Sequence, residues 1–248
     1  MDATSIEYSH WANEVPTSGN KVCFCIPTIT RPYPEMLASL EAEVPHLEKA
    51  GFEHSAVYCI GNPYISNARA TMLRKALDAK ADMVVFIDHD ISWREGELCH
   101  LLLTPGEVVA GTYRYKRDDE EDYMGALLSG PDGCPRRREE DGCLYGHSAP
   151  AGFLKVTTNA VNKFIEAYPE LCYGARHSPH IDLFNHGAHG NIWYGEDYAF
   201  SRRWRECGGE LIINQYLNLT HHSPDKRYPG NFDLWLRRQE GGDLELSL

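Results

Sequence analysis

The sequence predicts an α/β fold, in which one domain has a mixed, mostly parallel central sheet flanked by helices. Short apolar runs rich in β-branched residues alternate with longer stretches of helical periodicity. The run over residues 83–87 is apolar throughout, as expected for a strand that is buried on both faces. It ends abruptly in Asp88-His89-Asp90, and open α/β sheets bind their ligands at the carboxyl ends of the strands.

Composition limits the class of protein. The chain has 248 residues with 42% hydrophobic content, which suffices for one α/β domain. Its net charge of −12 argues against non-specific nucleic-acid binding, and no apolar run approaches the ~18 residues of a membrane span. The polar N-terminus does not read as a secretory signal, and the eight scattered cysteines read as reduced thiols. We therefore expect a cytoplasmic protein with a polar lead-in (1–20), one domain (21–222) and a tail (223–248).

The first half of the chain predicts strands alternating with helices. In order, they are a strand over 21–26, a helix from Glu35 that is interrupted near Pro45 and closed by Gly51, a strand over 55–60, a helix capped by Ser66, the central strand, a helix over 94–103 and a strand over 107–111. Arg69 falls in the first turn of its helix, where a cation opposes the helix dipole. We therefore expect a partner for it, either a bound nucleotide or one of the aspartates; the alternative is a solvated arginine.

The second half begins with a long charged segment, residues 117–146, which we interpret as a mobile lid. The elements expected after it are a strand over 149–156, a helix to about 168, a His-rich loop over 172–194, a helix from 195 to 207 and short strands over 210–213 and 217–219. The spacing of the histidines in the loop fits no standard zinc pattern. The last strand delivers His221 and His222 to a strand end.

The acidic motif allows two interpretations. Along an extended chain, Asp88 and Asp90 point the same way, and a hard divalent cation such as Mg²⁺ takes one or two carboxylates together with substrate phosphates. The alternative is a solvated turn or a cap for the next helix.

Five features together resemble the metal-dependent glycosyltransferases of the GT-A fold, close to family 2-like enzymes and their viral and phage relatives. In chain order, these are Ile26-Pro27-Thr28 with Arg31, Asn67-Ala68-Arg69, Asp88-His89-Asp90, Ala149-Pro150-Ala151-Gly152-Phe153, and Gly195-Glu196-Asp197 followed by Gly208-Gly209 and His221. They span about residues 21–222. The long charged segment and the His-rich loop depart from the simplest members of the family.

The resemblance implies roles for these residues. The nucleotide-sugar site would comprise Pro27, Thr28, Arg31, Asn67, Arg69, Asp88, His89 and Gly152. Asp90 and His221, with Asp88 through water, would hold Mn²⁺ or Mg²⁺, and His222 is the alternative to His221. Asp197 would be the general base with Glu196 beside it, and Tyr113 and Trp193 would stack on acceptor sugars.

The expected function is transfer of a sugar from a nucleotide-diphosphate donor, with UDP favoured, to a hydroxyl of a glycan or other acceptor, with inversion. Two alternatives remain. One is a carbohydrate- or nucleotide-binding protein without turnover, although binding alone would not need a base such as Asp197. The other is an Asp-X-Asp phosphatase, for which we would expect the motif on the first strand.

Overall fold

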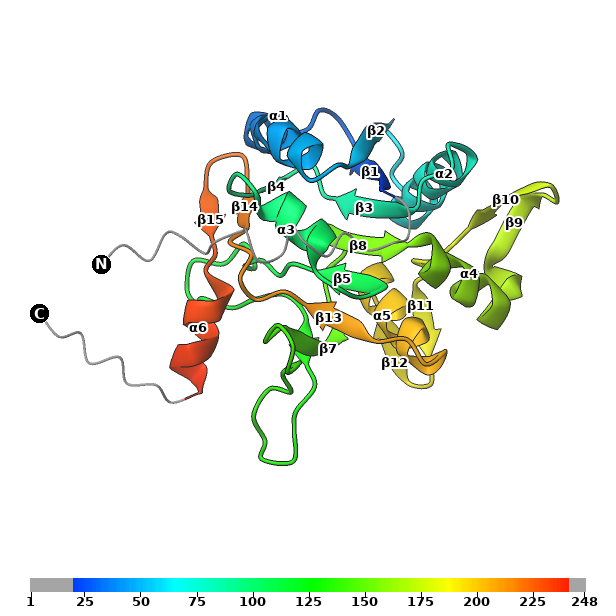
Figure 1. Cartoon of the computed structure of the whole chain (residues 1–248). Helices are drawn as coiled ribbons and strands as arrows, with labels where there is room; N and C mark the ends of the chain where they lie inside the picture. Colours follow the sequence, from blue (N-terminus) through cyan, green and yellow to red (C-terminus); the bar gives the residue numbers. More distant parts are fainter. Residues whose placement is uncertain (1–19, 241–248) are drawn as a thin grey trace, which may run out of the picture.

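The structure is a computed structural model that describes residues 20–240. It is built around an eight-stranded sheet with the order β2-β1-β3-β8-β5-β13-β7-β6 (Figure 1). The strands are β1 (Lys21–Thr28), β2 (Glu53–Ile60), β3 (Met83–Ile87), β5 (Val108–Ala110), β6 (Ala126–Leu127), β7 (Leu144–Ser148), β8 (Phe153–Thr157) and β13 (Leu211–Ile213). Only β7 and β8 run against the other six strands. The predicted mixed, mostly parallel sheet is therefore confirmed.

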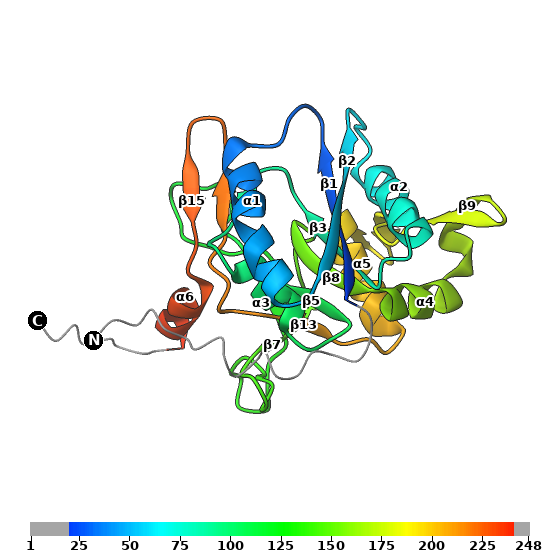
Figure 2. The ribbon, with the colours of Figure 1, turned by 45° about the horizontal axis from the view of Figure 1, so that its top comes forward.

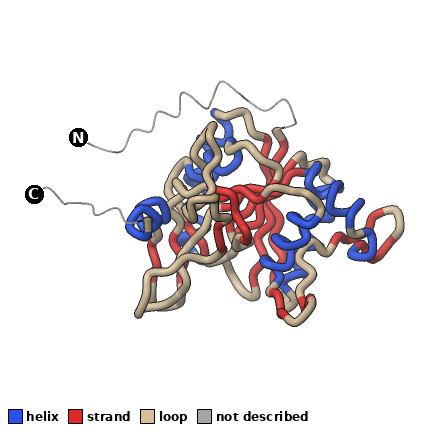
Figure 3. The backbone as a smooth tube through the Cα atoms, turned by 90° about the horizontal axis from the view of Figure 1, so that it is seen from below, coloured by secondary structure: helices blue, strands red, loops and turns tan. Residues whose placement is uncertain are grey.

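Helices cover both faces of this sheet (Figures 2 and 3). Helices α1 (Pro34–Lys49) and α3 (Glu97–Leu103) pack on one face, and α2 (Ile65–Asp78), α4 (Thr158–Ala167) and α5 (Glu196–Glu206) pack on the other. Residues of β3 alternate between the two cores: Val85 belongs to the first, whereas Val84 and Phe86 belong to the second. Both faces are buried, which explains why the sequence of β3 is apolar without interruption.

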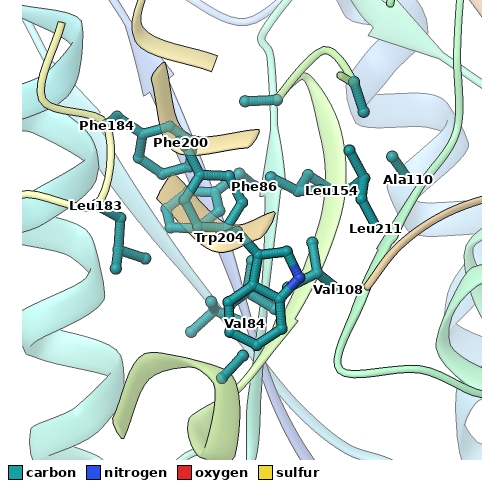
Figure 4. Close-up of a cluster of buried hydrophobic side chains, with 14 of the residues drawn as sticks. Val84, Phe86, Val108, Ala110, Leu154, Leu183, Phe184, Phe200, Trp204 and Leu211 are labelled. Atoms are coloured by element: carbon teal, nitrogen blue, oxygen red, sulfur yellow. The ribbon is translucent and has the colours of Figure 1, made fainter. Parts of the chain in front are cut away.

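The second core is built from large aromatic side chains of distant segments. Phe86 meets Phe184 edge to face, with ring centroids 4.9 Å apart, and Phe200 and Trp204 extend the cluster from α5 (Figure 4). Trp204 is fully buried and donates from Nε1 to the carbonyl of Glu210. This packing fixes α5, and with it the acids at the start of that helix, against the sheet.

Several predicted boundaries were wrong. Helix α1 continues through Pro45, which is exposed, so that the carbonyl left without a partner can face water. Helix α2 begins at Ile65, before the predicted cap Ser66. The Asn62 side chain accepts a hydrogen bond from the backbone N–H of Tyr64 (3.0 Å), so the preceding turn ends at Tyr64. Helix α3 begins only at Glu97, after Gly96 in the left-handed region (φ 88°). Residues 217–219 are not a strand.

The charged segment does not stand apart from the domain. It contributes β6 and β7 to the sheet, and it contains buried Tyr123 and Arg138. Its mobility remains a prediction. Residues 172–194, expected as a loop, form two hairpins: β9 (Cys172–Ala175) with β10 (Ser178–Ile181), and β11 (Gly187–His189) with β12 (Ile192–Tyr194).

A second, three-stranded sheet lies beyond the carboxyl end of β3. It has the order β15-β14-β4, formed by β4 (Ile91–Ser92), β14 (Thr220–His222) and β15 (Arg227–Pro229). The chain then forms α6 (Phe232–Gln239), whose Phe232 packs on Tyr123 with ring centroids 5.1 Å apart. The described part of the tail thus packs onto the domain, while residues 1–19 of the expected lead-in and 241–248 of the tail lie outside the described residues. Within residues 20–240, no helix is long and apolar enough to cross a membrane.

Candidate active site

The acidic motif forms a tight turn at the end of β3. The backbone N–H of Ile91 donates to the carbonyl of Asp88 (3.1 Å), which closes the turn. The chain is therefore not extended here, so the premise under which Asp88 and Asp90 would point the same way does not hold. Each carboxylate has its own set of partners.

Asp88 is one of two carboxylates held by Arg69. The guanidinium of Arg69 donates to Asp88 (Nη2–Oδ1, 2.8 Å) and to Glu196 (Nη1–Oε1, 3.0 Å), and it lies 4.9 Å from the ring centroid of Phe184. Arg69 is only 2% exposed. Burial alone would lower its pKa, but the charges of Asp88 and Glu196 outweigh burial and raise it. Of the two partners expected for Arg69, the structure supplies an aspartate, and it ties α2, β3 and α5 together.

Gly152 allows this corner of the site to close. It precedes β8, which runs against β3, so it lies at the same edge as the carboxyl end of β3. Its carbonyl accepts the N–H of Asp88 (3.0 Å). A Cβ at this position would lie 2.3 Å from the Tyr113 hydroxyl and 2.6 Å from Asp88 Oδ2. A glycine is therefore required by the close approach of these side chains.

Tyr113 does not present a ring to an acceptor sugar, contrary to our expectation. It is 2% exposed and packs edge to face on His221, with centroids 4.9 Å apart. Burial, followed by the charge of Asp88, raises its pKa well above the usual value, with Asp197 and Asp90 adding to the effect. The charges of all three aspartates of the candidate site therefore act on one buried phenol.

Asp90 faces His221. The pairing of β14 with β4 sets His221 opposite Ile91, and its Nε2 lies 3.6 Å from Asp90 Oδ2. Nδ1 of His221 lies 2.8 Å from the carbonyl oxygen of Arg114, which can only accept a hydrogen bond, so Nδ1 is the donor there and Nε2 is the ring nitrogen that faces Asp90. His222 instead is buried, with Nε2 at 2.7 Å from Ser92 Oγ. The geometry thus selects His221 of the two histidines.

The Asp90–His221 pair has the chemistry of a partial metal site. Within residues 20–240, no group of three or more His, Cys, Asp or Glu side chains is arranged around one metal position. Two bonds of about 2.1 Å meeting at a right angle separate their donor atoms by about 3.0 Å, and opposed bonds by about 4.2 Å. The separation of 3.6 Å lies in this range. A carbonyl that orients the ligating imidazole is also a usual feature of such sites. The residues fit a divalent cation whose remaining ligands come from water and substrate oxygens.

Glu196 and Asp197 open α5, where the helix dipole favours acids. Glu196 is held by Arg69, whereas the carboxyl of Asp197 contacts its own helix through the N–H of Tyr198 (2.8 Å). Burial, followed by the adjacent Glu196 carboxylate, raises the pKa of Asp197 to about 7. Of the two acids, Asp197 is therefore suited to exchange a proton near neutral pH.

The remaining residues expected at the nucleotide site lie around the same strand ends. Pro27 and Thr28 are buried at the end of β1, and Arg31 is exposed beyond it. His89 is partly exposed, with its carbonyl accepting the N–H of Tyr33 (2.9 Å). Asn67 is exposed at the start of α2. The structure thus brings these positions to one edge of the sheet.

Of residues 113–116, only Tyr113 was predicted from the sequence, and in a different role. Besides Tyr113 and the Arg114 carbonyl, this segment supplies Tyr115, whose hydroxyl lies 3.3 Å from that of Tyr198, and Lys116, which forms an ion pair with Asp90. The segment follows β5, whose carboxyl end lies at the same edge as that of β3. Ligands of open α/β sheets bind at the carboxyl ends of the strands, and this rule, which identified Asp88, would also have identified this segment.

Trp193 remains available for acceptor binding. It lies on β12, next to the start of α5, and is 71% exposed. Its ring centroid lies 6.2 Å from that of His186 on the same hairpin. An exposed tryptophan so close to Asp197 in the chain is consistent with a sugar-stacking surface.

Comparison with known proteins gives likenesses of structure. No family model matches the sequence, and no curated protein matches it either. Among solved structures, A197 from STIV is similar over 86% of this chain and 95% of its own, with a TM-score of 0.50 and 17% identity. GalNAc-T7 with UDP, GalNAc and Mn²⁺ gives a TM-score of 0.48 at 9% identity, covering 81% of this chain and 43% of that one. S. aureus TarS 1–349 in complex with UDP-GlcNAc gives a TM-score of 0.43 at 10% identity, and the match covers 84% of this chain and 57% of that one.

This chain therefore spans about half the length of those two chains. The likeness to A197 extends over most of both proteins and, at 17% identity, concerns the fold alone. Together with the strand order, it confirms the predicted fold class: the chain has a GT-A-like α/β fold.

Proposed function

We propose that this protein is a metal-dependent glycosyltransferase that moves a sugar from a nucleotide-diphosphate donor, with UDP favoured, to a hydroxyl of a glycan or related acceptor. The observation that carries the proposal is the position of Asp197. This acid has a pKa of about 7 and lies in one charged cluster with Asp88 and with the Asp90–His221 pair. Such a cluster combines a base with a site for a phosphate-bound cation.

In this proposal, Asp90 and His221 hold Mn²⁺ or Mg²⁺, which when bound neutralises charge on the departing diphosphate. Asp197 accepts the proton of the acceptor hydroxyl as the new glycosidic bond forms. Arg69 fixes Asp88 on the donor side and Glu196 beside the base, so the two halves of the site keep their relative positions. With Asp197 as the one base, acting on the face of the sugar opposite the leaving group, direct displacement inverts the configuration of the sugar.

The first experiment measures thermal unfolding with UDP, GDP, dTDP and CDP, each with and without Mn²⁺. A nucleotide at 100 times its Kd stabilises the folded protein by about 2.7 kcal/mol. For a chain of this size, we expect Tm to rise by about 5–10 °C. The shift should require Mn²⁺ and disappear in Asp90→Ala. If no nucleotide shifts Tm, the transferase proposal is wrong.

An Asp197→Asn variant separates an enzyme from a binding protein with the same site. We expect it to keep the Mn²⁺-dependent nucleotide shift and to lose sugar transfer, measured as release of the nucleoside diphosphate in the presence of acceptor sugars. Transfer at the wild-type rate would remove Asp197 from the mechanism.

A further inference from the structure

Lys116 occupies the face of Asp90 that the proposed metal would use. Its Nζ lies 2.5 Å from Oδ2 of Asp90, the same oxygen that lies 3.6 Å from Nε2 of His221. Asp90 is 15% exposed and Lys116 is 32% exposed, so the pair is shielded on one side and open on the other.

The backbone that carries Lys116 is fixed, while its side chain is not enclosed. The N–H of Tyr115 donates to the carbonyl of Asp122 (3.0 Å), and Arg114 forms a bridge to Tyr123 across the same hairpin-like turn. The carbonyl of Arg114 also holds His221. A lysine has a flexible four-carbon stem and a compact charge, so its ammonium can leave Asp90 without movement of this backbone.

An ammonium and a divalent cation do not share this carboxylate oxygen favourably. A cation bound about 2.1 Å from Oδ2 would lie close to the ammonium, and the two positive charges would repel each other. A donor diphosphate bound to the same cation places negative oxygens next to the displaced ammonium. A lysine is a common ligand of such phosphates.

We propose that Lys116 neutralises the charge of Asp90 when no metal is bound and competes with the divalent cation for this carboxylate. When the cation binds, the ammonium of Lys116 leaves Asp90 and forms an ion pair with the diphosphate of the donor. Lys116 then serves as a diphosphate-binding residue that is held at the site beforehand. This inference rests on the proposed function, because it requires a cation at Asp90 and a diphosphate donor.

The test compares Lys116→Met with Arg117→Met. Methionine keeps much of the apolar stem and removes the charge. Arg117 is the matched control, because it carries the same charge one residue away but lies over the Tyr115 ring (4.7 Å to the centroid) and 3.9 Å from Asp122. Mn²⁺ binding without nucleotide is followed by the electron paramagnetic resonance signal of free Mn²⁺. The difference in Mn²⁺ binding between wild type and Asp90→Asn gives the share of the bound Mn²⁺ that this site holds.

We expect Lys116→Met to bind Mn²⁺ about five- to tenfold more tightly than wild type, as expected for loss of a competing, partly buried ion pair. Arg117→Met should change the affinity by less than about twofold, since screening weakens exposed charges. UDP affinity is then measured calorimetrically at saturating Mn²⁺. Here Lys116→Met should bind UDP about tenfold more weakly, the loss of one charge-assisted contact, and Arg117→Met should match wild type.

The outcomes separate this inference from the proposed function. If Asp90→Asn loses Mn²⁺ but Lys116→Met binds it like wild type or like Arg117→Met, competition by Lys116 is refuted and the metal site stands. If Lys116→Met binds Mn²⁺ more tightly and UDP unchanged, transfer to the diphosphate is refuted. If wild type binds neither Mn²⁺ nor UDP, the proposed function itself fails and this inference fails with it.

Discussion

Replacing Asp197 with asparagine measures the free-energy cost of holding a carboxylate at this position. Asparagine has nearly the same shape and keeps an oxygen that can accept the N–H of Tyr198. It cannot ionise. In wild type, burial and the neighbouring Glu196 raise the pKa of this carboxyl from an ordinary 3.8 to about 7. The change therefore removes a charge that the folded protein disfavours at neutral pH.

The direction in which stability changes with pH follows from the difference in proton binding between the folded and unfolded states. Between about pH 4 and pH 7, the folded state holds the Asp197 proton and the unfolded state has released it, so the stability of wild type falls as pH rises. Three pKa units correspond to about 4 kcal/mol as an upper bound, because each unit is about 1.4 kcal/mol. Since the carboxyl is partly exposed and coupled to Glu196, we expect the advantage of Asp197→Asn over wild type to grow by about 1–2 kcal/mol between pH 5 and pH 8.

Urea unfolding followed by tryptophan fluorescence at micromolar protein concentration measures this difference at both pH values. Thermal unfolding should show Tm of the variant above wild type by about 2–8 °C at pH 8, with a smaller gap at pH 5. Asp119→Asn, a change to an exposed acid, is the control and should give the same small difference at both pH values. An equal difference for Asp197→Asn at pH 5 and pH 8 would refute the raised pKa and, with it, the argument that this acid is poised as a base.

Four further outcomes are expected. The kcat/KM of wild type should rise with pH through about 7 as Asp197 ionises, and a profile that is flat between pH 6 and 8 would count against that role. Arg69→Lys should destabilise the fold by about 3–5 kcal/mol in urea unfolding, because the buried pair of carboxylates loses its forked partner; a loss below about 1 kcal/mol would show that the bridge is unimportant. Gly152→Ala should weaken nucleotide binding at least tenfold through displacement of Asp88, whereas Gly195→Ala, whose new Cβ would lie no closer than 3.6 Å to its neighbours, should bind nucleotide like wild type; equal effects would remove the steric argument. Trp193→Ala should leave stability within about 0.5 kcal/mol of wild type and raise the acceptor KM while the donor KM stays unchanged; equal changes in both would argue against an acceptor surface.

The local sequence pattern predicted which helices and strands are present more accurately than it predicted their first and last residues. The strands β1, β3 and β13 and the helix α5 were predicted because burial imposes a period that the sequence must carry. The start of α2 was predicted wrongly, because a side-chain contact of Asn62 in the preceding turn decides it. The two hairpins within residues 172–194 were missed because their strands are short and largely exposed, so burial imposes little pattern on them.

Short-range patterns in the sequence are sufficient to place acids at the end of a buried strand and at the start of a later helix. Which of these groups meet depends on the packing of distant segments. Arg69 binds Glu196, which lies 127 residues later in the chain, as well as Asp88, and Lys116 and His221 reach Asp90 from two other segments. The physical reason is that a charge buried at a strand end must find its counter-charge in space, and the order of strands in the sheet, which no local pattern encodes, decides where that partner comes from.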